Sequence, residues 1–229
     1  KLLNYFQIKN QLISYHKFNE KKISLKIIES LKKNKIISLI SDAGTPVISD
    51  PGKILIKKCI EENINIFPIP GASAVTSAVS ISGFSDQYLF YGFPPKKEKE
   101  LENVLKNLNN LDFSIVFFVP ISKINFYLLE FKKYFYDREI LIAREMTKIH
   151  ERFTRDKVNQ IKNLPDILKG EITIVISNKE KNKNIQKIIN ENIKKNIKKM
   201  LSKYSHKDVV DFISQKECLP KKLIYDYCL

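Results

Sequence analysis

Apolar side chains recur with two different spacings in the first part of the chain. A helical spacing runs through residues 20–33, where one face carries Ile23, Ile27, Ile28 and Leu31. Short apolar runs that are typical of strands occupy residues 11–16, 36–40 and 64–68. Strands that alternate with helices indicate βαβ units, so we expect an α/β fold with a largely parallel sheet in this part.

The pattern restarts after Gly83–Asp86, where we place a domain boundary. We expect strands at 88–93, 113–119, 139–144 and 170–176, an extended segment at 151–155, and helices at 97–110, 122–135 and 156–163. This order of elements predicts a second α/β domain built on a mixed sheet.

The composition changes near residue 178. Residues 179–203 contain nine lysines against two glutamates, with isoleucines at helical spacing. This segment is either a solvated basic helix or a region that adds affinity for a polyanion. Ser205 and Asp208 form a capping box for a further helix, and Pro220 suits the first turn of a last one. The domains we predict are therefore 1–84, 88–177 and a basic helical tail at 178–229.

The loop Asp42–Gly52 is the strongest candidate for a ligand site. The apolar run 36–40 leads into two glycines, two prolines and two aspartates, and the chain has only six glycines in all. Such a loop between a strand's carboxyl end and a helix is where open α/β sheets bind ligands. We expect Asp50 to be the N-cap of the following helix. A second loop, 68–74, holds another of the six glycines and ends on Ser73, a candidate cap.

The net charge of +15 suggests a polyanionic partner, although part of the lysine content can reflect an AT-rich coding sequence. Arginine is more informative, because three of the four arginines lie at positions 144, 152 and 155, where bidentate donors suit phosphate. No apolar run approaches the ~20 residues of a membrane span. Three cysteines without a CxxC pair indicate reduced thiols in a cytoplasmic protein, with no metal site.

Five motifs occur in a characteristic order: SDAGTPVISDPG (41–52), PIPGASA (68–74), YGFPPK (91–96), AREMTKIHE (143–151) and KGEITIVI (169–176). Together they closely resemble the bacterial ribosomal RNA 2′-O-ribose methyltransferases of the tetrapyrrole-methylase superfamily. The resemblance implies two α/β domains with a cleft between them, a small helical module at the carboxyl end, and a homodimer. In that family a strand, a glycine-bearing turn and a helix precede the segment that residues 1–6 resemble. We therefore expect this sequence to be a fragment.

The resemblance also implies S-adenosylmethionine as the cofactor. Gly44, Thr45 and Ile48 would line its methionine half, Ser73 and Ala74 would meet the adenosine, and Val119, Ile172 and Thr173 would add further contacts. The implied substrate is the 2′-hydroxyl of a cytidine in 16S RNA of the small ribosomal subunit. Two alternatives stay open: a porphyrinoid C-methyltransferase, which Thr45 argues against because those enzymes carry Asp there, and a non-catalytic RNA-binding remnant.

Methyl transfer to a hydroxyl needs a base that takes its proton. The candidates are Asp42, Glu145 and His150, and the sequence does not rank them. Glu145 is alternatively a residue that orients its loop through Lys148 or the backbone. For RNA phosphate we expect contacts from Arg144, Lys148, Arg152 and Arg155. His16, in the pattern SYHxxNE, is equally a site residue or a core histidine.

Overall fold

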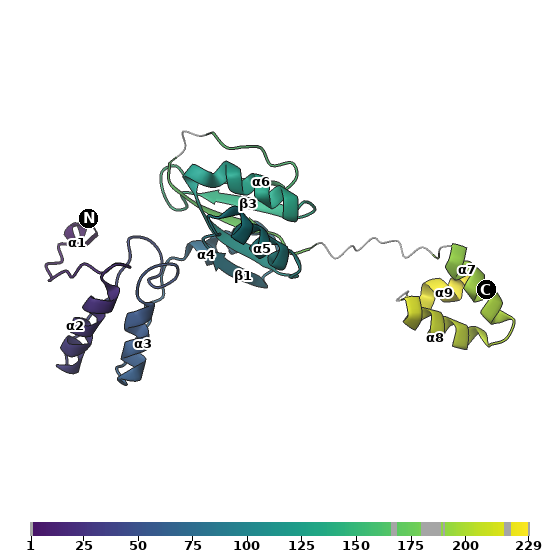
Figure 1. The fold of residues 1–229 in the computed structure, drawn as a ribbon, viewed down its shortest axis with the longest axis horizontal. Helices are drawn as coiled ribbons and strands as arrows, with labels where there is room; N and C mark the ends of the chain where they lie inside the picture. Colours follow the sequence, from purple (N-terminus) through teal and green to yellow (C-terminus); the bar gives the residue numbers. More distant parts are fainter. Residues whose placement is uncertain (1, 166–168, 180–188, 190, 218–220, 229) are drawn as a thin grey trace. The chain divides into compact units, whose positions relative to one another are not determined.

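The structure is a computed structural model that describes residues 2–165, 169–179, 189, 191–217 and 221–228 (Figure 1). Two compact units make up the chain, Lys1–Lys179 and Glu180–Leu229. The predicted subdivision of the first unit at residues 84–88 stays a prediction.

A five-stranded sheet forms the centre of the first unit. Its strands are β1 (Tyr88–Gly92), β2 (Ser114–Pro120), β3 (Glu139–Arg144), β4 (Arg152–Lys157) and β5 (Glu171–Ile176), in the order β1-β2-β5-β3-β4. β1 and β2 are parallel, whereas β2–β5, β5–β3 and β3–β4 are antiparallel. The mixed sheet predicted for this part of the sequence is therefore confirmed.

Helices cover both faces of this sheet (Figure 1). One face packs on α5 (Glu98–Asn109), the 3-10 turn η1 (Ile121–Lys123) and α6 (Ile124–Tyr134), and the other packs on α4 (Ala74–Ser82). Successive strand residues point to opposite faces, so Ile174 lies in the core under α5 and α6, while its neighbour Val175 lies in the core under α4. Burial on both faces explains the continuous apolar runs of β2, β3 and β5.

The strand directions bring several chain ends to one edge of the sheet. Val119 near the end of β2 pairs with Ile172 near the start of β5, and Ile172 pairs in turn with Arg144 at the end of β3. Because β1 runs parallel to β2, its last residue Gly92 lies at the same edge. We call this the carboxyl edge of the sheet.

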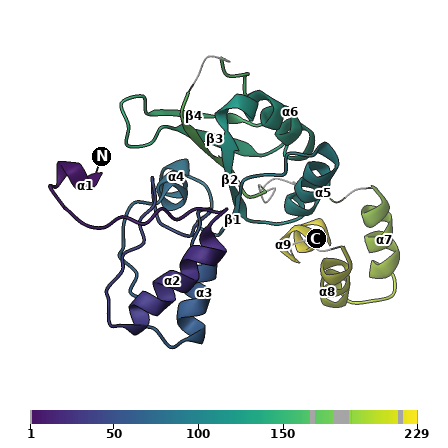
Figure 2. The ribbon, with the colours of Figure 1, turned by 60° about the vertical axis from the view of Figure 1, so that its left-hand side comes forward.

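The first part of the chain is helical but has no strands in the described residues. It contains α1 (Leu2–Tyr5), α2 (Glu20–Lys32) and α3 (Lys53–Glu61), and α2 and α3 lie side by side over a shared apolar cluster (Figure 2). The strands predicted at 11–16, 36–40 and 64–68 are wrong for this structure. A ladder needs hydrogen bonds from a neighbouring strand, and none of the described residues supplies them.

The predicted helix at 156–163 is also wrong. Residues up to Lys157 continue β4, and the N–H of Val158 donates to the carbonyl of Arg138 at 2.8 Å, which extends the pairing beside β3. Sheet hydrogen bonds thus hold residues up to Val158, and a single turn follows, in which the N–H of Ile161 donates to the carbonyl of Lys157 at 3.0 Å.

The N-terminus of α3 is capped from a distance by Glu20. Gly52, and not Asp50 as predicted, holds the N-cap position, and glycine has no side chain that could cap. The Glu20 carboxylate instead accepts the N–H groups of Gly52 at 2.9 Å and Ile54 at 3.1 Å, and the hydroxyl of Tyr15 at 3.0 Å. The pattern SYHxxNE thus builds the support of the Asp42–Gly52 loop.

His16 belongs to the same turn. Its backbone N–H donates to the Asn19 side chain at 2.8 Å, and its Nδ1 accepts the N–H of Phe18 at 3.3 Å. Its side chain is exposed, so the core-histidine interpretation is wrong.

We predict that Glu20→Ala lowers the free energy of unfolding by roughly 2–4 kcal/mol, because two backbone N–H groups lose their acceptor. Burial raises the pKa of Glu20, but the hydrogen bonds from Gly52, Ile54 and Tyr15 outweigh it and hold the pKa below its ordinary value of 4.5. The stabilisation is therefore complete above pH 4.5 and is lost as the pH falls through the lower folded-state pKa. Thermal unfolding and amide exchange at Gly52 and Ile54 measure both effects.

Glu29→Ala is the matched control, since Glu29 lies exposed on the same helix α2. An equal loss of stability in the two variants would contradict the capping role of Glu20.

The second unit packs α7 (Glu191–Leu201), α8 (His206–Glu217) and α9 (Lys221–Cys228) around one apolar cluster. The predicted cap of α8 is confirmed: the N–H of Asp208 donates to Ser205 Oγ at 3.3 Å, and that hydroxyl donates to the Asp208 carboxylate at 2.6 Å. Pro220 and Cys218 lie outside the described residues. Across the described ranges, no helix has the length and apolar character needed to cross a membrane.

Candidate functional site

The two glycine-bearing loops of the sequence lie against each other. The Thr45 hydroxyl donates to the carbonyl of Ala72 at 3.2 Å, and Gly44 sits beside the same carbonyl with a φ of +69°. Gly44, Thr45 and Ile48 are exposed, and Ser73 and Ala74 at the start of α4 are half-buried. The tertiary structure therefore brings five of the predicted cofactor residues to one accessible place.

The Asp42–Gly52 loop also reaches the carboxyl edge of the sheet. A Cβ added to Gly92 at the end of β1 would lie 3.2 Å from Ser49 Oγ. Within the loop, Val47 has a φ of +73° and Ser49 a φ of +63°. A β-branched residue rarely adopts this conformation, which costs about 1–3 kcal/mol and is typical of functional loops.

Asp50 is a further candidate site residue, which the sequence pattern had indicated only as a helix cap. Loss of hydration in its surroundings, together with the carboxylates of Asp42 and Glu171, raises the pKa of Asp50. A carboxylate with a raised pKa is a stronger base, so Asp50 joins Asp42 as a candidate proton acceptor. Its place in the motif SDPG had suggested a helix cap, and Glu20 fills that role instead.

The remaining predicted cofactor residues are buried at the same edge. Val119 and Ile172 pair across β2 and β5, and their side chains lie in the core under α5 and α6. Thr173 is 4 % exposed and points to the α4 face. Val119 and Ile172 can therefore reach a ligand only through their backbone groups.

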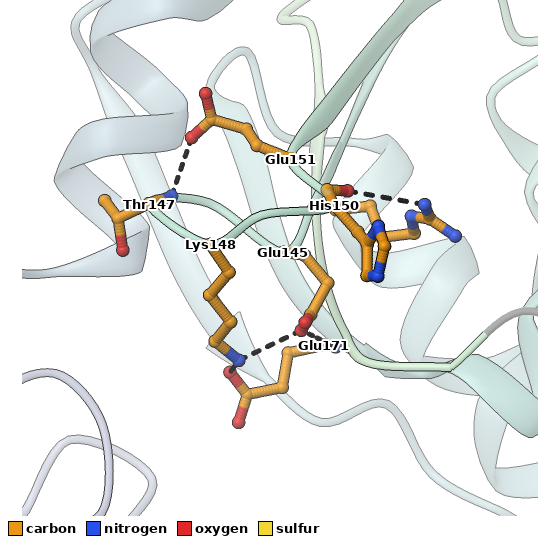
Figure 3. Close-up of polar contacts among 7 residues, drawn as sticks. Glu145, Thr147, Lys148, His150, Glu151 and Glu171 are labelled. Atoms are coloured by element: carbon orange, nitrogen blue, oxygen red, sulfur yellow. Dashed lines mark hydrogen bonds and ion pairs between the residues drawn. The ribbon is translucent and has the colours of Figure 1, made fainter.

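The loop between β3 and β4 is anchored by Glu145 (Figure 3). Glu145 Oε1 accepts the N–H of Glu171 at 2.8 Å and Lys148 Nζ at 2.9 Å, and Lys148 Nζ also contacts a Glu171 carboxylate oxygen at 3.0 Å. The hydrogen bond from the Glu171 N–H, followed by the one from Lys148, lowers the pKa of Glu145. Gly170 has a φ of +112°, which favours glycine, and a Cβ there would also overlap the Glu145 side chain.

The Glu145 carboxylate already accepts two hydrogen bonds and has a lowered pKa, so it is a weak base. This network therefore favours the orienting role of Glu145. It also places the Lys148 ammonium between two carboxylates, so a phosphate contact from Lys148 would have to compete with both. The His150 side chain is exposed, and its backbone carbonyl accepts Arg144 at 3.3 Å.

The clustered arginines divide between the two faces of the sheet. Arg144 and Arg152 are directly opposite each other on β3 and β4, in register with the face under α5 and α6, and the Nε of Arg144 is buried without a partner. Arg155 faces the other way and donates to the carbonyl of Ile81 at the end of α4. Like charges opposite each other destabilise a sheet, so the Arg144–Arg152 pair is suited to an anion between them.

We predict that Glu145→Gln lowers catalytic turnover several-fold without changing its pH profile. The amide keeps an acceptor for the N–H of Glu171 but loses the charge that holds Lys148, so the loop is loosened and no titrating base is removed. Initial rates across the pH range measure the effect. A pH profile that loses its acidic limb would instead identify Glu145 as the base, and Glu151→Gln in the same loop is the control.

Comparison with known proteins points to one family. A family model described as Tetrapyrrole (Corrin/Porphyrin) Methylases matches residues 5–162. A Thermotoga maritima protein named Ribosomal RNA small subunit methyltransferase I is 42 % identical over 182 residues, which cover 78 % of this chain and 82 % of that protein. A protein of the same name from Mesomycoplasma conjunctivae is 41 % identical and is covered to 79 %, with 82 % of this chain aligned.

Solved structures share the fold at low sequence identity. Diphthine synthase superposes with a TM-score of 0.57 at 14 % identity, covering 77 % of this chain and 72 % of that one. A uroporphyrin-III C-methyltransferase from Thermus thermophilus, complexed with S-adenyl homocysteine, has a TM-score of 0.51 at 8 % identity, covering 76 % and 80 %. These structures show the shared fold. The family model over residues 5–162 and the relatives at 42 % and 41 % identity establish that the chain belongs to the tetrapyrrole methylase family.

Proposed function

We propose that this protein is an S-adenosylmethionine-dependent methyltransferase that acts on the 2′-hydroxyl of a cytidine ribose in 16S RNA of the small ribosomal subunit. The observation that carries the proposal is the meeting of the Asp42–Gly52 loop with residues 70–74 and with the carboxyl edge of the sheet. The names of the relatives above 40 % identity support an RNA substrate.

The residues at this place fit the cofactor. Gly44 and Thr45, with the start of α4 at Ser73, present backbone groups and a hydroxyl to a small polar ligand. The carboxylates of Asp42 and Asp50 suit a cation, and S-adenosylmethionine supplies a methyl group on a positively charged sulfonium. Ile48, Ala74, Val119, Ile172 and Thr173 complete the proposed cofactor site.

The protein's own contribution is alignment and removal of a proton. Holding the ribose hydroxyl in line with the methyl group supplies most of the rate enhancement. Among the four proposed proton acceptors, Asp42 and Asp50 are accessible at the loop, His150 is exposed beyond it, and Glu145 is tied into its own network.

Arg144 and Arg152 are the proposed phosphate contacts nearest the carboxyl edge, with Lys148 and Arg155 as secondary ones. A cytoplasmic homodimer belongs to the same proposal, as the resemblance implies. A porphyrinoid substrate is the second candidate, because the matching family model describes corrin and porphyrin methylases. The charge of +15 and Thr45 favour RNA.

The test is methyl transfer by the full chain. Purified protein, S-adenosylmethionine with a labelled methyl group and small subunits whose 16S RNA lacks the modification should give label in RNA, on a cytidine 2′-oxygen. Label on uroporphyrinogen instead would support the porphyrinoid candidate. RNA binding without transfer to either substrate would identify a non-catalytic RNA-binding protein.

A further inference from the structure

A cavity of about 730 Å³ opens beyond the ends of β1 and β2, and no predicted site residue lines it. Its walls are the segment that follows β1 and the η1–α6 junction that follows β2, with Lys96, Glu98, Ile121, Ser122, Lys123, Ile124, Asn125 and Phe126. This volume lies within the ~300–1,000 Å³ of typical ligand pockets.

Two polar side chains, the buried Tyr127 and the half-buried Asn125, hold the walls in place. The Tyr127 hydroxyl donates to the carbonyls of Pro94 at 3.4 Å and Pro95 at 3.2 Å, which fixes the segment after β1. The Asn125 side chain donates to the carbonyl of Leu164 and accepts its N–H, both at 2.8 Å. The cavity is therefore preformed and does not depend on an ordering step.

Within the described residues, the two lysines of the cavity lack the ion pairs that Lys106 on α5 and Lys133 on α6 make. Lys106 and Lys133 on these helices pair with Glu102 and Glu130 at 2.6 Å. Within the described part of the chain, neither Lys96 nor Lys123 has a carboxylate at ion-pair distance. Glu98 is the acidic residue of the lining, and its charge acts on Lys133.

The helix α6, which starts at this cavity, breaks a local rule. Its N-cap residue is Lys123, which makes no side-chain capping hydrogen bond, and its first turn has no acidic residue. A helix N-terminus favours a capping oxygen and a negative charge, so a cation there is unfavourable without an anion. At α5, by contrast, Glu98 and Glu100 lie in the first turn, and the N-cap residue Lys97 pairs with Glu100 at 3.3 Å. Local rules are broken mainly at functional sites, where a ligand compensates.

The cavity also offers an apolar surface beside the charges. Phe126 and Ile121 are half-buried and pack against the core, which leaves part of each side chain to the cavity. Nucleobases stack on aromatic rings, while phosphates bind lysine and helix N-termini. Arg144 on β3 and Arg152 on β4 lie on the same face of the sheet, two and three strands away from β2, which corresponds to ~10 and ~14 Å across the sheet.

We propose that this cavity is a second RNA subsite, which takes one nucleotide of the single-stranded substrate, with its phosphate at Lys96 and Lys123 and its base against Phe126. The inference rests on the proposed function, since it assumes an RNA substrate. It adds a binding site distinct from the loops that would hold the cofactor and the target ribose.

The test compares two charge-matched double variants of the full chain. Lys96→Gln with Lys123→Gln removes both cavity charges, whereas Lys99→Gln with Lys132→Gln removes two charges from α5 and α6 outside the cavity lining. The two lysines are proposed to hold one phosphate, and losing that contact removes a counterion-release gain of roughly fourfold at about 0.15 M salt. The cavity variant should therefore bind a short single-stranded RNA roughly fourfold more weakly, with a log–log salt slope flatter by about 0.7.

S-adenosylmethionine affinity by calorimetry should be unchanged in both variants, and the control should bind RNA like the parent. A Phe126→Leu variant, which keeps an apolar side chain, should weaken RNA binding while the salt slope stays the same. Equal losses in the two double variants would overturn the subsite in favour of long-range charge. Binding of free cytidine monophosphate at the cavity without competition by RNA would overturn it in favour of a mononucleotide site. If the parent protein methylates RNA and the two double variants bind RNA with equal affinity, the subsite is overturned and the proposed function stays intact.

Discussion

Replacing Gly71 with valine should weaken S-adenosylmethionine binding by roughly tenfold to a hundredfold, the effect of 1–3 kcal/mol of overpacking. In the structure a Cβ at Gly71 meets no heavy atom closer than 4.0 Å, and its φ lies outside the left-handed region. The folded protein thus has room for the new side chain. A loss of affinity measured by calorimetry would therefore show that S-adenosylmethionine itself lies against the loop 68–74.

Gly83→Ala is the opposite control. Gly83 follows α4 with a φ of +77° and has open space around it, so alanine strains the backbone and costs roughly 1 kcal/mol of stability. It should lower the unfolding temperature and leave cofactor affinity unchanged. Unchanged affinity in Gly71→Val would place the cofactor away from this loop.

Arg152→Gln should change stability and substrate affinity in opposite directions. Removing one of two like charges opposite each other on β3 and β4 should stabilise the fold by roughly 0.5 kcal/mol. The same change should weaken RNA binding by tenfold or more, because a charge-assisted hydrogen bond contributes about 1.5–3 kcal/mol. Chemical denaturation and the KM for small subunits measure the two effects.

Lys157→Gln is the matched control, since Lys157 lies on the same strand with its side chain on the other face. Arg144→Lys should raise the KM for RNA and spare cofactor affinity, because lysine keeps the charge and loses the bidentate fork. If Arg152→Gln gains stability without any loss of RNA affinity, the two arginines repel each other but do not bind phosphate.

Local patterns were sufficient for most of the second half of the first unit, with the exception of the helix expected at 156–163. β3 at 139–144 and the helices near 97–110 and 122–135 occur where the apolar spacing predicted them. These elements are defined by residues two to four positions apart, and both faces of their sheet are buried. The unusual loops were also visible, because a chain with six glycines concentrates them where backbone geometry demands it.

Contacts between distant residues decided the rest. The run 36–40 has the composition of a strand, yet a strand exists only with a partner, and Ile36 is 98 % exposed. The cap of α3 comes from Glu20, 32 residues before Gly52, so the spacing around Asp50 could not reveal it.

The arginines show the same limit. Three of them lie close together in the sequence. The register of β3 and β4 nevertheless puts Arg144 and Arg152 on one face and Arg155 on the other. Likewise the loop after β3 presents Lys148 to Glu171 of β5, a strand that begins 23 residues later. The sequence by itself determined which segments carry the chemistry. Only the tertiary structure decided which side chains share a surface, because strand pairing sets the register and the register sets the face.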